Sequence, residues 1–177
     1  YGLNINMWSN SNGNQLKSIF SKLMKINLSK DANDIIKISM LTNAYLPEND
    51  ISKKEFLKFK SDWLMKYSNL DLIEEYITKI KIINLSPELA KYLVNEHLSD
   101  ANINKACEFF SKNLEPIDDE YLLKFKIYCL VEMGKKDEAQ LVLDLKKEIG
   151  FKDEYFEKKI GFLIGYSDTS LFPAWTF

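Results

Sequence analysis

The stretch LAKYLVNEHLSDANINKACEFFSK (residues 89–112) and the stretch LLKFKIYCLVEMGKKDEAQLVLDLKKEIG (residues 122–150) decide the fold of this chain. Each has apolar residues at helical spacing on both sides of a polar turn, which predicts a helical hairpin. Tyr92 corresponds to Tyr128 at an offset of 36 residues, and a period in this range is typical of helix-turn-helix solenoids. We therefore predict an all-α fold in which antiparallel helical hairpins stack as a short solenoid of eight to nine helices, with Ala101 or Ala106, and also Ala139, at close helix crossings.

Capping residues mark the starts of further helices. Ser52 is followed three residues later by Glu55, which is the pattern of a capping box. The segment after Ser29 is apolar on nearly every side, so we expect a buried helix that ends before Pro47. No segment alternates apolar and polar residues for long enough to predict a strand. The other expected helix starts are Asn14, Asn69, Ser86, Asp100, Asp118, Asp137 and Asp153.

These patterns divide the chain into three segments. Residues 1–13 are polar and turn-rich, and we expect them to form an extended lead-in whose Trp8 packs over the first hairpin. Residues 14–165 form the predicted single α-helical repeat domain. Residues 166–177 are an aromatic tail or the start of a following segment.

The tail places Phe172, Trp175 and Phe177 close together in the sequence. Aromatic side chains are enriched at protein interfaces, so these three residues are candidates for docking a partner. The alternative is that the tail packs back over the last hairpin. Because the segment has no basic residue, we expect it to bind lipid only weakly.

The composition narrows the class of protein. Hydrophobic residues make up 46% of the 177 residues and charged residues 28%, which is typical of an ordered chain. No apolar run approaches the roughly 18 to 20 residues that span a bilayer, so we expect no membrane span. All 24 basic residues are lysine and the net charge is −2, which provides neither bidentate base recognition nor attraction to a polyanion. We therefore expect no nucleic-acid partner.

Residues suited to catalysis or metal binding are few. His97 is the only histidine, and it lies near the end of an expected helix, where it commonly interacts with the helix C-terminus. Structural zinc needs about four clustered ligands, which His97 and two distant cysteines do not supply. The sequence GKK at Gly134 lacks the pattern of a phosphate-binding loop. We expect no catalytic, cofactor-binding or metal-binding residue, no cofactor and no enzymatic activity.

Four segments carry a resemblance to a known group of proteins: residues 7–13 (MWSNSNG), 37–47 (KISMLTNAYLP), 105–110 (KACEFF) and 128–156 (YCLVEMGKKDEAQLVLDLKKEIGFKDEYF). They resemble a group of poorly characterised, exported α-proteobacterial helical-repeat proteins, some of which bear the label antifreeze-glycopeptide-related. The arginines expected in that group are replaced by lysine or lost here. The matching positions are Trp8, Ser9, Pro47, Ala106, Cys107, Tyr128, Cys129, Gly134 and Ala139.

More broadly, Leu130, Gly134 and Ala139 resemble tetratricopeptide-like helical hairpin repeats, although the full signature of that repeat is absent. As a class, such repeats bind other proteins in a concave groove. The first resemblance implies a periplasmic or exported protein with a longer parent chain, and a cytoplasmic protein is the alternative. The chain begins with Tyr1, so we expect a processed protein or a piece of a longer one.

Cys107 and Cys129 lie on consecutive expected helices. Folding the chain at the turn between these helices brings the two cysteines to similar heights. They are therefore candidates for a disulfide if the protein is exported to an oxidising compartment, as the resemblance implies. The alternative is a pair of buried thiols that pack as small apolar residues.

Two classes of function remain, besides a purely structural segment of a larger assembly. The first is a non-enzymatic scaffold that holds a protein partner and belongs to a larger exported bacterial protein or assembly. The second is a helical ligand-binding or enzymatic domain that uses buried carboxylates and tyrosines. A scaffold should present a groove along successive helices, whereas an enzyme should have a deep pocket with convergent polar groups.

Overall fold

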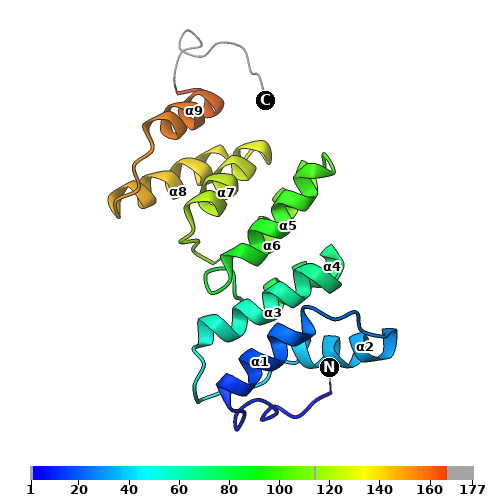
Figure 1. Ribbon diagram of the computed structural model, residues 1–177. Helices are drawn as coiled ribbons and strands as arrows, with labels where there is room; N and C mark the ends of the chain where they lie inside the picture. Colours follow the sequence, from blue (N-terminus) through cyan, green and yellow to red (C-terminus); the bar gives the residue numbers. More distant parts are fainter. Residues whose placement is uncertain (1, 114, 167–177) are drawn as a thin grey trace. The chain divides into compact units, whose positions relative to one another are not determined.

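The computed structural model describes residues 2–113 and 115–166, and this part of the chain contains nine α-helices and no β-strand (Figure 1). The prediction of an all-α fold with eight to nine helices is confirmed. The prediction that the hairpins stack in the manner of tetratricopeptide repeats stays a prediction. The helices are α1 (Gly13–Leu23), α2 (Lys30–Leu41), α3 (Lys53–Tyr67), α4 (Leu70–Ile80), α5 (Pro87–Ser99), α6 (Ile103–Lys112), α7 (Glu120–Glu132), α8 (Lys136–Glu148) and α9 (Glu154–Ile164).

Most helices begin at a side chain that caps them. The capping box at α3 is present, because Ser52 and Glu55 each accept a hydrogen bond from the backbone N–H of the other. Asn69 and Asp153 accept hydrogen bonds from the first turns of α4 and α9, as expected. The seventh helix, α7, is capped by Asp119, one residue after the expected start at Asp118.

The expected start of α6 at Asp100 is wrong. Asp100 ends α5, and its backbone N–H donates to the carbonyl of Glu96. The chain then reverses at Ala101, which has a φ of 54° and is exposed, so of the two alanines expected at a helix crossing only Ala106 is buried. Asn102 follows and accepts a hydrogen bond from the Lys105 N–H at 3.2 Å, so it takes the capping role.

The α2 helix is less buried than its apolar sequence predicts. Its last two residues, Met40 and Leu41, are buried. In contrast, 67% of Ile35 and 37% of Ile38 are exposed. Only the C-terminal end of α2 therefore contributes to the core.

The chain divides into two compact units, Tyr1–Ala106 (unit 1) and Cys107–Phe177 (unit 2). In unit 1, α5 packs against α3 and α4, and the fully buried side chains include Phe56, Leu64 and Ile73. The ring of Trp8 contacts Phe20 and Phe56 at centroid distances of 6.1 and 5.5 Å. The prediction of one repeat domain over residues 14–165 stays a prediction, since contact density does not measure folding cooperativity.

Unit 2 is built on the hairpin of α7 and α8, with α9 packed against both. The hairpin turns at Gly134, whose φ of 76° lies in the left-handed region that favours glycine. Ala139 and Leu143 are the buried residues of α8. None of the nine described helices combines the length and the apolarity needed to cross a membrane.

We predict that Ala139→Leu destabilises the protein by roughly 1–3 kcal/mol, because Ala139 is 0% exposed and a larger side chain overpacks the site. Urea unfolding followed by circular dichroism measures the change. Glu148→Leu, at an exposed position of the same helix, is the control and should unfold as the wild type does. Equal stability of Ala139→Leu and wild type would contradict the helix crossing.

Candidate functional site

The outer side of α8 is apolar and exposed. Leu141, Leu145 and Ile149 are spaced by four residues, so they lie along one side of the helix and its C-terminal end. They are exposed by 60%, 52% and 75%, respectively. We call these three residues the α8 apolar face. It is distinct from the buried side of α8, which packs through Ala139 and Leu143.

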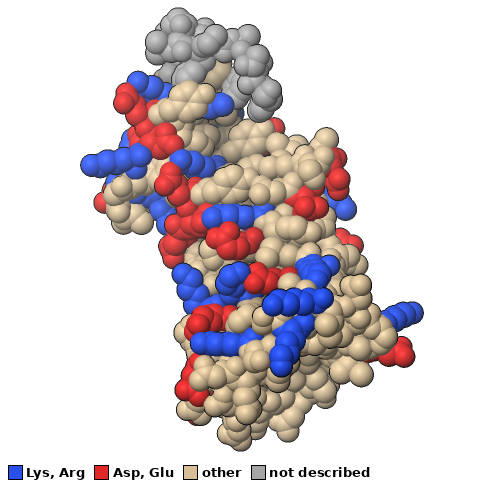
Figure 2. Space-filling view, in the orientation of Figure 1, with Lys and Arg blue, Asp and Glu red and all other residues tan. Residues whose placement is uncertain are grey.

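Carboxylates follow one edge of the α8 apolar face. At about 100° of rotation per residue, Asp137, Asp144 and Glu148 lie beside it, and all three are exposed. Elsewhere, acidic and lysine side chains are intermixed on the visible surface in Figure 2. The α8 apolar face therefore has an acidic border, which favours a partner of opposite charge.

A shallow cavity of about 250 Å³ continues the α8 apolar face at Ile149. Its walls include Leu123 and Phe151, so the apolar surface extends past the end of α8. Asp118, Glu120 and Lys146 supply the charged groups of the same cavity, and Lys146 lies 3.8 Å from Asp118 in an ion pair. The cavity therefore extends the apolar surface of α8 beside charged groups of both signs, with two carboxylates and one lysine.

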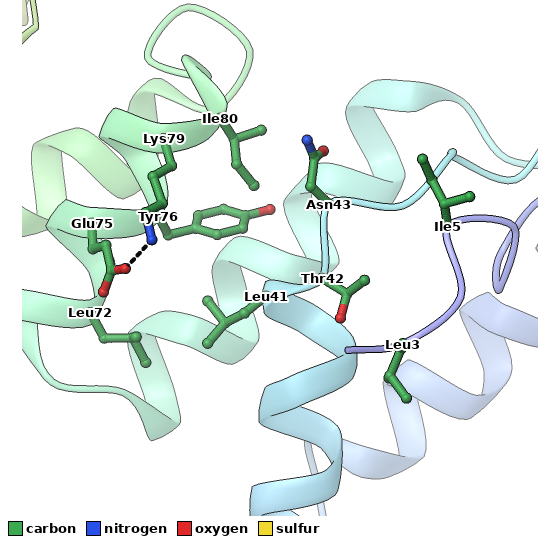
Figure 3. A pocket seen from close by; sticks show the side chains of 10 residues that line it. All are labelled: Leu3, Ile5, Leu41, Thr42, Asn43, Leu72, Glu75, Tyr76, Lys79 and Ile80. Carbon is green, nitrogen blue, oxygen red and sulfur yellow. Dashed lines mark hydrogen bonds and ion pairs between the residues drawn. The ribbon is translucent and has the colours of Figure 1, made fainter. Parts of the chain in front are cut away.

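A larger cavity of about 450 Å³ lies in unit 1 between the N-terminal segment, the end of α2 and α4 (Figure 3). Its polar groups belong to Thr42, Asn43, Tyr76 and the ion pair of Glu75 with Lys79. Its volume falls within the range of small-molecule sites, about 300–1,000 Å³. The apolar lining consists of Leu3, Ile5, Leu41, Leu72 and Ile80.

Tyr76 brings an unsatisfied hydroxyl group to the wall of this cavity. Figure 3 shows its ring pointing from α4 across the cavity towards the chain at Thr42 and Asn43. The side chain is 3% exposed, and its hydroxyl has no hydrogen-bond partner among the described residues. Burial raises the pKa of Tyr76, so the hydroxyl stays protonated and remains a donor.

Lys60 of α3 lies behind the same wall. Its Nζ is 3.4 Å from the carbonyl oxygen of Thr42 and 5.6 Å from the centroid of the Tyr76 ring. The side chain is 3% exposed, and no described carboxylate forms an ion pair with it. Burial lowers the pKa of Lys60 from 10.5 to about 8.

Lys60 was not among the predicted site residues, although its position in the sequence indicates that it is buried. Lys60 follows Phe56 by four residues and precedes Leu64 by four. Both neighbours are fully buried. A lysine in phase with the apolar side of a helix is therefore a recognisable exception to the usual exposure of lysine.

We predict that Lys60→Met is more stable than wild type by up to about 3 kcal/mol at pH 7, the value that corresponds to a pKa of about 8 instead of 10.5. Below pH 8, Lys60 is protonated in the folded and the unfolded chain, so the folded protein bears the full cost of burying the ammonium. Between about pH 8 and 10.5 the unfolded chain binds more protons, so the wild type gains stability as the pH rises.

Urea unfolding at a series of pH values measures this difference. The advantage of Lys60→Met should shrink as the pH approaches 10.5, while Tyr76, the titratable group that faces Lys60, is the same in both proteins. Lys54→Met changes an exposed lysine of the same helix and should show no such trend. If the difference in stability between Lys60→Met and wild type did not change with pH, the burial of a charged ammonium at Lys60 would be contradicted.

Cys107 of α6 and Cys129 of α7 form a disulfide in the structure, with their Cα atoms 5.1 Å apart. Both residues are buried, and the bond closes a loop with a sequence separation of 22 residues. The structure thus brings these two predicted site residues together. In unit 2, the bond ties α6 to the hairpin of α7 and α8.

We predict that reduction of this disulfide lowers the free energy of unfolding by about 3 kcal/mol, because the open chain is less restricted when unfolded. Urea unfolding with and without a phosphine reductant measures the loss. A Cys107→Ala and Cys129→Ala double variant should not respond to the reductant. The disulfide would be refuted if protein purified from its native compartment contained two thiols that can be alkylated under denaturing conditions.

The remaining site predictions fall outside this geometry. Phe172, Trp175 and Phe177 lie outside the described residues. His97 is in the last turn of α5, as expected, and its buried Nε2 has no partner among the described residues. No described carboxylate is buried, and no group of three or more metal-ligating side chains occurs in the described part of the chain. The buried ionisable groups are therefore Lys60, Tyr76 and His97 rather than carboxylates.

Comparisons of the chain with protein-family models, with curated proteins and with solved structures found no match. The features of the described residues that bear on function are therefore the α8 apolar face and the cavity at Tyr76.

Proposed function

We propose that this protein is a non-enzymatic scaffold for protein–protein interaction, and that its α8 apolar face docks a basic amphipathic helix of a partner protein. The observation that carries this proposal is the exposure of Leu141, Leu145 and Ile149 on one side of a helix whose other side already packs in the core. Contiguous exposed apolar residues with a polar border are typical of interaction sites.

The spacing of the face indicates the shape of the partner. Three side chains spaced by four residues follow a line along α8, and a second helix with apolar residues at similar spacing can lie along that line. The shallow cavity at Ile149 gives a docked side chain a place to insert.

The acidic border indicates the charge of the partner. Asp137, Asp144 and Glu148 would attract lysine or arginine residues that flank the apolar side of the docked helix. The aromatic tail at residues 166–177 contains no basic residue, so it lacks this complementarity. A partner in trans therefore fits the site better than the tail of the same chain.

We also propose that the protein works outside the cytoplasm, as part of a larger exported bacterial protein or assembly. The disulfide between Cys107 and Cys129 supports this proposal, because such bonds persist in oxidising compartments and are rare in the cytosol.

A synthetic amphipathic peptide with leucine on one side and lysine at the flanking positions tests the scaffold proposal. We predict that it binds the wild type, and that a Leu141→Ser and Leu145→Ser double variant binds it about tenfold or more weakly, since two buried leucine contacts are lost. Calorimetric titration measures both affinities. The lysine peptide should also bind less tightly as the salt concentration rises.

Two controls make this test specific. A peptide with glutamate in place of lysine should bind poorly, because it meets the acidic border of α8. Ile35→Ser removes an equally exposed apolar residue from unit 1 and should leave the binding unchanged. Equal binding of the two peptides, or of the double variant and the wild type, would rule out docking on the α8 apolar face.

A further inference from the structure

The cavity of unit 1 combines features that a purely structural gap does not need. Five aliphatic side chains line it, and a buried tyrosine hydroxyl reaches its wall. Buried polar groups in folded proteins nearly always have a hydrogen-bond partner, because leaving one unpaired costs stability. The hydroxyl of Tyr76 has no partner among the described residues, so it can donate a hydrogen bond to an acceptor that enters the cavity.

The ammonium of Lys60, behind the Tyr76 side of the cavity, indicates that a negatively charged acceptor fits there. The ammonium of Lys60 has only a backbone carbonyl and the rings of Phe56 and Tyr76 as its described neighbours. A negative group in the cavity near Tyr76 would accept the hydroxyl hydrogen bond. It would also offset part of the cost of burying the ammonium, since both lie against the same wall.

We propose that this cavity is a binding site for a monocarboxylate with an aliphatic chain, such as a medium-chain fatty acid. The chain of the ligand would lie against Leu41, Leu72 and Ile80, and its carboxylate would lie at Tyr76 on the side of Lys60. The site is in unit 1 and is independent of the α8 apolar face in unit 2, so either proposal can fail alone.

The N-terminal segment forms one side of the cavity. Leu3 and Ile5, which are 42% and 50% exposed, line it (Figure 3). The carbonyl of Ile5 accepts a hydrogen bond from the Tyr45 N–H at 2.8 Å, which holds this segment beside the end of α2. In the proposed complex these two apolar side chains would lie against the aliphatic chain of the ligand.

The test compares three ligands with the same chain length on the full chain: decanoate, 1-decanol and decylamine. Calorimetric titration should show that decanoate binds most tightly and decylamine most weakly, because the Tyr76 hydroxyl can donate to a carboxylate and the Lys60 ammonium repels an amine. The other two charges on the cavity, Glu75 and Lys79, form an ion pair with each other. This comparison of the three affinities uses only the wild-type protein. Decylamine binding as tightly as decanoate, or no detectable binding of decanoate, would overturn the proposal.

Two variants then locate the site. Tyr76→Phe should weaken decanoate binding by about tenfold or more, because a hydrogen bond to a charged group is lost. Lys60→Met should weaken the binding of decanoate and leave that of 1-decanol unchanged. Tyr155→Phe, which makes the same chemical change at an exposed position of unit 2, is the matched control.

Loss of folding cannot explain the expected result for Tyr76→Phe. That variant removes a buried hydroxyl that has no described partner, so its melting temperature should equal or exceed that of the wild type. Decanoate affinities that are equal in Tyr76→Phe and wild type would overturn the assignment of the site, and equal effects of Lys60→Met on decanoate and 1-decanol would overturn the role of the charge.

Discussion

The helices of this protein are short, and that constraint governs the rest of the structure. The described helices have between 10 and 15 residues, and isolated helices of that length are marginal in water. Each one must therefore bury one side against a neighbour, and most of them also begin at a capping side chain; α5 and α8 have none. The capping box of α3, the asparagine and aspartate caps of α4, α7 and α9, and the fully buried Ala139 show both features.

The same constraint explains how much of the fold could be predicted from the sequence. Caps and apolar spacing are local, so the number of helices and most of their starts follow from residues within one or two turns. The start of α6 did not follow, because Asp100 and Asn102 are both good capping residues and only the reversal at Ala101 decides between them. The exposure of Ile35 in α2 depends on which neighbours reach it, and the local pattern does not contain that information.

The two candidate sites could not be predicted from the sequence pattern, for a related reason. In α8, Ala139 with Leu143 and Leu141 with Leu145 are both pairs spaced by four residues. Helical periodicity alone cannot say which pair faces the core. In unit 1, the position of Lys60 between Phe56 and Leu64 could have predicted its burial, but the missing partner of Tyr76 could not have been foreseen. It depends on which atoms of α2 and the N-terminal segment lie opposite the hydroxyl.

Ion pairs and a disulfide link the helices of unit 2. Lys147 of α8 pairs with Glu157 of α9 at 2.8 Å, and Lys124 of α7 pairs with Asp153 at 2.6 Å. Asp153 also caps α9, and the hydrogen bond from Lys124 lowers the pKa of its carboxyl group. The disulfide adds a covalent tie from α6 to α7.

Ala139 and Leu143 pack α8 into the core of unit 2, and Lys147 links it to α9, while Leu141, Leu145 and Ile149 stay exposed. A surface whose backbone is already ordered loses less conformational entropy when a partner binds. The α8 apolar face can therefore contribute more of its apolar contact area to affinity than a flexible segment of the same composition. This supports the proposed docking on α8, whose backbone is helical before a partner binds.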